Sequence, residues 1–212
     1  MDPSSWQTYL VTQESHSADR DTERIVSDAL EGGVDVIQLR EKGMPAHSRY
    51  RRGVQVRALT DEAGVPLIVN DRIDLAKAIA ADGVHLGQSD LPVAIARDQL
   101  GPDAIVGCST ATVAEARAAV AAGADYLGVG AVFQTDSKDL PDEEHAIGTE
   151  RVRAIVDAVD VPVIGIGGID ADNAASVINA GATGVAVISA ITAAEDPGAA
   201  ARTLSEVISH AN

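Results

Sequence analysis

Two aspartates follow short apolar runs in the first half of the chain. Asp71 comes directly after the run 66–70, and Asp90 lies three residues beyond the run 83–87. If these runs are neighbouring parallel strands, the two carboxylates face one point at the same edge of the sheet. Mg²⁺ is commonly held by one or two carboxylates, waters and substrate phosphate oxygens. The alternative is that both aspartates cap helices, where Asp is frequent, and the spacing alone leaves the two interpretations even.

Three cations stand near the ends of similar runs in a very acidic protein. They are Arg40, Lys42 and Lys138, and the chain has only one other lysine, Lys77. Arginine binds phosphate through forked hydrogen bonds and lysine acts as a point charge, so this group suits a diphosphate. The alternative is surface ion pairing, with Glu41 and Asp139 as partners.

A glycine-rich segment, 165–168, precedes the last apolar run, which ends at Ile188-Ser189. In parallel barrels the loops after the seventh and eighth strands bind phosphate through backbone amides. This pattern indicates a phosphorylated ligand but no particular reaction, and the glycines could instead serve packing alone. Neutral side chains suited to reading a heterocycle lie between the two anion sites: Gln38, Asn70 and Ser109.

The elements that must position these residues alternate between strand and helix. We expect strands at 8–11, 34–40, 66–70, 83–87, 104–109, 126–133, 161–167 and 184–189. Several are continuous apolar runs, as in strands covered on both faces. Thr112 and Glu115 form a predicted capping box, and Asp170 and Thr149 are candidate N-caps.

Four helix ends share one pattern, in which a glycine precedes the next strand. The glycines expected to take the left-handed conformation that stops a helix lie in the segments 31–35, 81–85, 122–125 and 180–183. Strict alternation predicts a parallel sheet. Eight units, and no glycine fingerprint after the first strand, favour a closed (β/α)₈ TIM barrel over an open sheet. We expect one domain over 1–212, short of the roughly 250 residues typical of such barrels.

Composition limits the classes of molecule that the chain is expected to bind. The formal net charge of −16 argues against nucleic acids and anionic membranes. Aromatic residues make up only 2% of the chain, so we expect Val, Ile, Leu and Ala to fill the core. Cys108, the only cysteine, reads as a small buried residue. The chain is expected to be cytoplasmic and to act on small molecules, with homo-oligomerisation open. The acidity fits a salt-adapted protein and an ordinary acidic one equally.

With these segments in view, the chain resembles the thiamin-phosphate synthase family over most of its length, from Tyr9 to Ser189. The most specific pieces are Val36-Ile37-Gln38-Leu39-Arg40-Glu41-Lys42 and the stretch from Leu67-Ile68-Val69-Asn70-Asp71-Arg72 to Asp82-Gly83-Val84-His85-Leu86-Gly87-Gln88-Ser89-Asp90-Leu91-Pro92. Members join a pyrimidinylmethyl diphosphate to a thiazole phosphate and release diphosphate.

The resemblance implies a role for each candidate residue. Mg²⁺ is implied as the cofactor, with Asp71 and Asp90 as its ligands. Arg40, Lys42, Lys138 and Ser109 would act in catalysis. The pyrimidine diphosphate would be held by Gln38, Leu39, Arg40, Glu41, Lys42, Asn70, Ser109 and Lys138. The thiazole phosphate would be held by Thr135, Asp136, Ser137, Gly167, Gly168, Ile188 and Ser189, with Gly167 and Gly168 as alternatives for one position.

One departure from the family pattern stands after the sixth strand. Members often have Thr-Pro-Thr-Lys there, and this chain has Gln134-Thr135-Asp136-Ser137-Lys138, so Asp136 adds negative charge near the expected thiazole phosphate. Two other functions remain in view. A thiazole tautomerase on the same barrel would have a histidine near Ala111, and a non-catalytic thiamin-phosphate binder would have little use for the diphosphate site.

Overall fold

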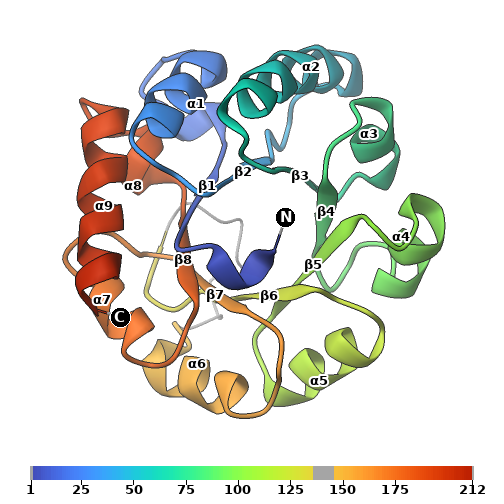
Figure 1. The fold of residues 1–212 in the computed structure, drawn as a ribbon, viewed down its shortest axis with the longest axis vertical. Helices are drawn as coiled ribbons and strands as arrows, with labels where there is room; N and C mark the ends of the chain where they lie inside the picture. The colour runs from blue at the N-terminus through green and yellow to red at the C-terminus, as the bar shows by residue number, and fades with distance from the viewer. Residues whose placement is uncertain (1, 136–145, 212) are drawn as a thin grey trace.

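The strands close into a ring with the helices outside it. A computed structural model describes residues 2–135 and 146–211, in which eight parallel strands pair in the order β1-β2-β3-β4-β5-β6-β7-β8 and β8 pairs back to β1 (Figure 1). The predicted (β/α)₈ barrel is confirmed. Within the described ranges no helix is both long and apolar enough to cross a membrane.

All eight predicted strands are present, and most are shorter than predicted. The strands are β1 Thr8–Val11, β2 Val36–Leu39, β3 Leu67–Asn70, β4 Gly83–Leu86, β5 Ile105–Thr110, β6 Tyr126–Val129, β7 Val163–Ile166 and β8 Gly184–Val187. The helices are α1 Thr22–Glu31, α2 Ala46–Ala63, α3 Ile73–Ala78, α4 Val93–Leu100, α5 Val113–Ala121, α6 Gly148–Val156, α7 Ala174–Ile178, α8 Ser189–Thr192 and α9 Pro197–Ala211, with short 3₁₀ turns η1 Pro3–Ser5 and η2 Glu14–His16.

Helix starts followed the sequence only in part. The capping box of α5 is confirmed, with the Thr112 hydroxyl accepting from the Glu115 amide and the Glu115 carboxylate accepting from the Thr112 amide. The other two predicted caps are wrong. Thr149 lies inside α6, and α7 begins after Asn173 because a turn separates Asp170 from the helix.

The glycine rule held at three helix ends and failed at the fourth. Gly33, Gly123 and Gly181 have positive φ, as predicted. After α3 it is Ala80 that takes the left-handed conformation, and Gly83 belongs to β4. A Cβ on Gly83 would lie 2.0 Å from the carbonyl oxygen of Ile105, so this glycine serves the close approach of two strands.

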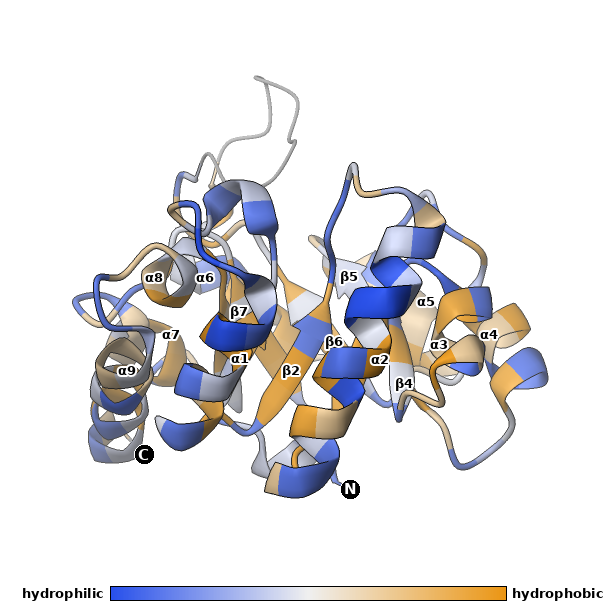
Figure 2. Cartoon of the chain, turned by 90° about the horizontal axis from the view of Figure 1, so that it is seen from above, coloured by the Kyte–Doolittle hydropathy of each residue, from blue (hydrophilic) through white to orange (hydrophobic). Residues whose placement is uncertain are grey.

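Side chains of the closed sheet divide into two layers by strict alternation along each strand. The outward set, such as Leu10, Ile37 and Leu67, packs beneath the helices in the larger apolar cluster. The inward set, such as Val36 and Ile68, forms a separate cluster inside the ring. Figure 2 shows strands that are mostly hydrophobic, surrounded by helices that carry both hydrophilic and hydrophobic residues.

The larger core beneath the helices is aliphatic, as expected, but aromatic rings fill the floor of the barrel. Trp6, just after η1, packs edge-on against Tyr9 of β1 and Tyr126 of β6, with ring centroids 5.9 and 5.2 Å apart. The N-terminal turn crosses the centre of the ring in Figure 1 and carries Trp6 there. Overall composition could not reveal that three of the five aromatic residues gather at one place.

Two glycines make room for the polar rings inside the barrel. A Cβ on Gly107 of β5 would lie 2.2 Å from the Tyr126 ring, and one on Gly128 of β6 would lie 2.8 Å from His85. Both are inward strand positions at which any side chain would collide. The interior is therefore filled by a few large side chains alternating with glycine.

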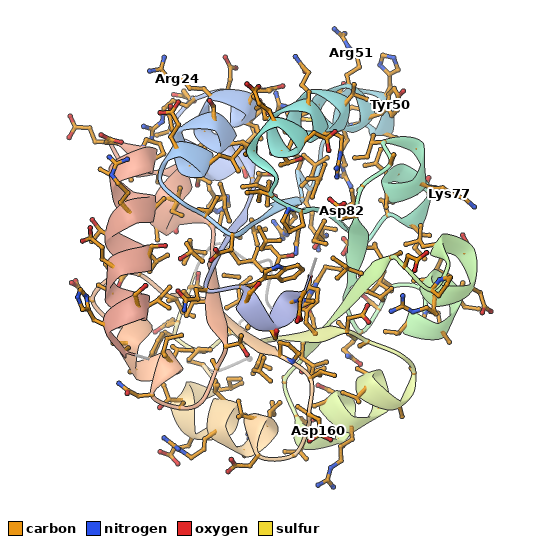
Figure 3. The ribbon with its side chains drawn as sticks, in the orientation of Figure 1. Arg24, Tyr50, Arg51, Lys77, Asp82 and Asp160 are labelled. Carbon is orange, nitrogen blue, oxygen red and sulfur yellow. The ribbon has the colours of Figure 1, made fainter. Side chains whose placement is uncertain are left out.

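A recurring aspartate ties three of the repeats to the strand before them. Asp35, Asp82 and Asp125 each stand just before or at the start of a strand and accept a backbone amide of the preceding strand or its approach, at Thr8, Leu67 and Val106 respectively. Arg57 and Arg97 add ion pairs to Asp82 and Asp125. Figure 3 labels Asp82 beside the barrel. These contacts explain why the repeated turn carries an aspartate.

We predict that Gly107→Ala destabilises the protein by about 1–3 kcal/mol, because the added methyl strikes the far end of the Tyr126 ring in a close-packed interior. Chemical denaturation measures the loss. The matched background is Tyr126→Leu, which lacks the ring atoms that the methyl would strike; there the same glycine substitution should cost much less. Equal costs in the two backgrounds would contradict the packing explanation.

Candidate active site

A cavity opens at the carboxyl ends of the strands, where the chemistry of such barrels lies. Its narrow inner part is lined by Tyr9, Val11, Gln38, Arg40, Asn70, His85, Ser109, Tyr126, Gly128, Ile164, Ile166, Ala186 and Ile188. A wider neighbouring hollow of about 560 Å³ is lined by residues 134–135, 166–170 and 186–190. Both include Ile166, Ala186 and Ile188, so the two spaces adjoin.

The two aspartates of the sequence analysis meet at this rim. Asp71 follows β3 in a left-handed conformation, with φ +63°, which Asp tolerates better than most residues. Its carboxyl group lies close enough to Asp90 for the two to interact electrostatically, and Asp90 Oδ2 accepts the Gly87 amide at 2.6 Å. Neither residue is a helix cap, because the N-cap positions of α3 and α4 are Arg72 and Pro92. The structure therefore gives the capping alternative no support.

The pairing changes the acidity of one carboxyl group. Burial, followed by the proximity of Asp90, raises the pKa of Asp71 to about 6, and Lys42 and Arg40 oppose the rise only partly. Two carboxylates that destabilise each other when both are ionised are suited to a divalent cation. Among the described residues no group of three or more His, Cys, Asp or Glu side chains could hold a metal. An ion here would therefore need oxygen ligands from water or substrate.

Two of the three predicted cations, Arg40 and Lys42, stand beside this pair. Lys42 Nζ lies 3.7 Å from Asp71 Oδ2. Arg40 is buried and donates from Nη1 to Gln13 Oε1 at 2.6 Å. The same oxygen accepts the Lys42 amide at 3.1 Å, so one glutamine after β1 holds both residues. Sequence reasoning missed Gln13, although its place just beyond a strand end was a signal.

Two of the residues predicted to bind the pyrimidine diphosphate direct their side chains elsewhere. Leu39 is an outward position and packs in the apolar layer beneath the helices. Glu41 is buried, and its carboxylate accepts from the Thr22 hydroxyl at 2.8 Å and the Glu14 amide at 2.9 Å. A role in ligand binding would therefore fall to their backbone groups. The Glu41 carboxylate anchors the loop instead.

The three neutral residues do face the inner cavity. Gln38 and Asn70 are inward positions on β2 and β3, and Ser109 is one on β5. Asn70 Nδ2 is buried and has no hydrogen-bond partner among the described residues. A buried donor without a partner is costly, so Asn70 is suited to a ligand acceptor.

His85 joins Ser109, and the sequence analysis did not find this pair. His85 Nε2 lies 2.9 Å from Ser109 Oγ, and Nδ1 lies 3.0 Å from the Tyr126 hydroxyl. The signal was its place between Val84 and Leu86, because two outward apolar residues force the residue between them inward. The pair is not a Ser-His-Asp triad, because a phenol stands where the aspartate would be, and burial raises the pKa of Tyr126 further.

The predicted phosphate site surrounds the wider hollow. Thr135, Gly167, Gly168, Ile188 and Ser189 all line it. Both glycines have positive φ, and a Cβ on Gly168 would lie 2.5 Å from the Gln134 carbonyl oxygen. Packing and conformation therefore already require them, which neither supports nor opposes phosphate binding. Asp136, Ser137, Lys138 and Asp139 lie outside the described residues.

Comparison with known proteins identifies the family of this chain. The family model described as thiamine monophosphate synthase matches residues 8–191. The chain belongs to this family. A thiamine-phosphate synthase of Haloarcula marismortui is 61% identical over 96% of this chain and 97% of its own, and one of Natronomonas pharaonis is 58% identical over 94% of each. The solved thiamine phosphate pyrophosphorylase of Pyrococcus furiosus superposes with a TM-score of 0.89, at 39% identity, over 99% of this chain and 98% of its own. The family predicted from the sequence is confirmed.

For this member of the thiamine monophosphate synthase family, we predict that Asp71→Asn stabilises the metal-free protein by about 1–3 kcal/mol at pH 7.5. The native pKa of Asp71, about 6, exceeds its ordinary 3.8, so the folded state takes up a proton as the pH falls from 6 to 4. Wild-type stability therefore carries the full penalty above pH 6, and the penalty shrinks as the pH falls from 6 to 4, below which it is gone. The gain from the substitution should fade over the same interval in thermal melts with chelator.

Asp74→Asn is the control for this measurement. Asp74 is exposed on α3 and pairs with Arg72, which lowers its pKa, so its substitution should give a neutral or slightly destabilising effect. A pH-independent gain in Asp71→Asn would mean that relief of strain at positive φ, and not carboxylate repulsion, is responsible.

Proposed function

We propose that the chain is a thiamin-phosphate synthase, which joins 4-amino-2-methyl-5-pyrimidinylmethyl diphosphate to a thiazole phosphate and releases diphosphate. The observation that carries the proposal is the meeting of Asp71 and Asp90 beside Lys42, at the rim of the cavity that contains Gln38, Asn70 and Ser109. That arrangement suits a diphosphate above a neutral heterocycle. The glycine-lined hollow next to it suits a second, phosphorylated partner.

The residues of the rim act on the leaving group. Arg40 and Lys42 neutralise charge that grows on the diphosphate as the bond to carbon breaks. Gln13 holds both in place, so this charge stabilisation is present before the substrate arrives. The aminopyrimidine supports the benzylic-type cation that remains, and no protein nucleophile is required. Positioning of the two substrates supplies the other part of the rate.

Asp71 and Asp90 would hold Mg²⁺. Their mutual destabilisation and their oxygen donors fit a hard divalent cation that keeps several waters and substrate oxygens. When bound, the ion would supply further positive charge to the diphosphate.

The thiazole phosphate is assigned to the wider hollow. Ile188 and Ser189 border it from the β8 side and Gly167 and Gly168 from the β7 side. Asn173 supports the β7 side of the hollow by donating from Nδ2 to the Gly168 carbonyl at 2.9 Å. Because this hollow adjoins the inner cavity, a thiazole held there would lie next to the pyrimidine, within reach of the carbon that its ring nitrogen attacks. For Asp136, Ser137 and Lys138 the same assignment rests on the sequence alone.

Other functions fit the geometry less well. This chain lacks the histidine expected of a thiazole tautomerase. Ala111 occupies that position, and its amide donates to Glu115. A serine hydrolase would need His85 to be stabilised as a cation, and its Nδ1 partner is the buried Tyr126 phenol. A binder of thiamin phosphate would gain nothing from two carboxylates and two cations at the diphosphate position. A cytoplasmic location and action on small molecules follow from the proposed activity.

Purified protein given both substrates and Mg²⁺ should form thiamin phosphate and diphosphate, measured by chromatography and a coupled diphosphate assay. Asp71→Ala should lower kcat by at least about 100-fold, because it removes a proposed Mg²⁺ ligand and with it the charge stabilisation that the ion would give the leaving group. Lys77→Ala is the control, since Lys77 points away from the barrel on α3 (Figure 3) and should leave the rate unchanged. No turnover at any salt concentration, together with tight binding of thiamin phosphate, would favour the binder.

Removal of divalent cations should abolish turnover reversibly. Chelation takes away the charge that offsets the Asp71–Asp90 pair, and added Mg²⁺ should restore the rate. The apparent affinity for Mg²⁺ should weaken as the pH falls below about 6, because protons compete for Asp71. Isothermal titration of Mg²⁺ at pH 5, 6 and 7.5 tests this, and a pH-independent affinity would exclude Asp71 as a ligand.

A further inference from the structure

A chain of hydrogen bonds links the two ends of the inner cavity through the barrel floor. Gln38 Nε2 donates to the Tyr9 hydroxyl at 2.8 Å, and that hydroxyl lies 2.9 Å from the Tyr126 hydroxyl. Tyr126 reaches His85 Nδ1 at 3.0 Å, and His85 Nε2 reaches Ser109 Oγ at 2.9 Å. The five side chains come from β2, β1, β6, β4 and β5. The two ends of this chain of hydrogen bonds, Gln38 and Ser109, are the residues expected to hydrogen-bond the heterocycle.

The direction of every hydrogen bond in this chain is set by its first member. An amide NH₂ only donates, so Tyr9 accepts from Gln38 and gives its single proton to Tyr126. Tyr126 then gives its proton to His85 Nδ1, which must be unprotonated. A neutral His85 therefore has its hydrogen on Nε2 and donates it to Ser109 Oγ. The Ser109 proton is left to point elsewhere, into the cavity that this residue lines.

Burial keeps each phenol in the chain a one-proton group. Tyr9 and Tyr126 are fully buried, and burial raises the pKa of both well above the ordinary value of a phenol. Their rings are fixed by Trp6, and Gly107 and Gly128 leave space only for Tyr126 and His85. These contacts hold the phenol and imidazole rings in their places in the relay. The chain therefore transmits the orientation of the Gln38 amide to the Ser109 hydroxyl.

We propose that this relay through Tyr9, Tyr126 and His85 fixes the hydrogen-bonding polarity of the pocket and so selects an aminopyrimidine over its oxo counterpart. With Nε2 turned to Tyr9, Gln38 offers its carbonyl oxygen as an acceptor and Ser109 offers its hydroxyl as a donor. An aminopyrimidine supplies the complement, an amino donor and a ring-nitrogen acceptor. A 4-oxopyrimidine supplies a carbonyl acceptor and a ring N–H donor, which would need every bond of the relay reversed. The three relay residues are positioning residues, and the inference rests on the proposed function only for the identity of the ring.

The direction of the relay can be measured without substrate. Long-range ¹H–¹⁵N correlation spectra of the uniformly ¹⁵N-labelled protein distinguish the two neutral tautomers of histidine, and His85→Gln assigns the His85 signals among the five histidines of the chain. We expect His85 to be protonated on Nε2. In Tyr126→Phe the donor to Nδ1 is lost, and the spectrum should change to the Nδ1-protonated form or to a mixture. An Nδ1–H tautomer in the unaltered protein would overturn the proposal.

Binding measures the selectivity itself. The probes are the monophosphates of the 4-amino and the 4-oxo pyrimidinylmethanols, which keep the ring but lack the diphosphate leaving group, titrated by calorimetry. The unaltered protein should prefer the amino compound by about 100-fold, since mismatched polar groups in a buried site discriminate strongly. Tyr126→Phe should reduce this preference at least tenfold while the ring packing is kept. An unchanged preference, or binding of neither phosphate, would overturn the proposal.

Thr110→Val is the matched control. Thr110 is the buried residue next to Ser109 on β5, and its hydroxyl has no partner among the described residues. Its removal should leave both the His85 tautomer and the amino-to-oxo preference within about twofold of the unaltered protein. A protein that forms no thiamin phosphate but still selects the amino compound through Tyr126 would refute the proposed function alone. A protein that turns over normally with its preference intact in Tyr126→Phe would refute the relay alone.

Discussion

Closure of the sheet is the constraint on which the site depends. Once eight short strands form a ring, every second residue of each strand must point into a small interior, and the intervening residues must face the helices. Each strand therefore offers only two or three inward positions. In the lower tier these hold apolar and aromatic side chains, and in the upper tier they hold Gln38, Asn70, His85 and Ser109. Function is confined to these upper positions and to the residues just beyond them.

Alternation also explains which parts of the site could be predicted from the sequence. The eight runs were recognisable because strands buried on both faces are apolar throughout, and polar residues after them had to share one rim. Asp71 and Asp90 were found in this way. Applying the same rule inside the strands would have placed Leu39 outward and His85 inward. The prediction from the residues used strand ends alone, so it overlooked His85, and the ligand role of Leu39 came from the family resemblance.

What the sequence could not supply depends on contacts between distant segments. Gln13 holds Arg40 and Lys42 because the loops after β1 and β2 are neighbours. Its place beyond a strand end indicated a residue of the rim, but nothing local indicated these two partners. Trp6 reaches the barrel floor because the N-terminal turn folds across the ring. Gly83 resembled a helix stop, but its role is the approach of β4 to β5. In each case the role of the residue depends on a contact with a segment that is distant in the sequence.

The charges of the rim explain how so acidic a protein can bind two anions. The chain as a whole has a formal charge of −16, which opposes the approach of phosphates, although salt screens this opposition beyond about 10 Å. Among the described residues of the rim, Arg40 and Lys42 only balance Asp71 and Asp90, so these four side chains alone offer a diphosphate no net attraction. A divalent ion at the proposed position makes the local charge positive where the leaving group lies. The proposed cation therefore accounts for two aspartates in a site for an anion, and under this proposal the substrate is attracted to the loaded site and not to these side chains alone.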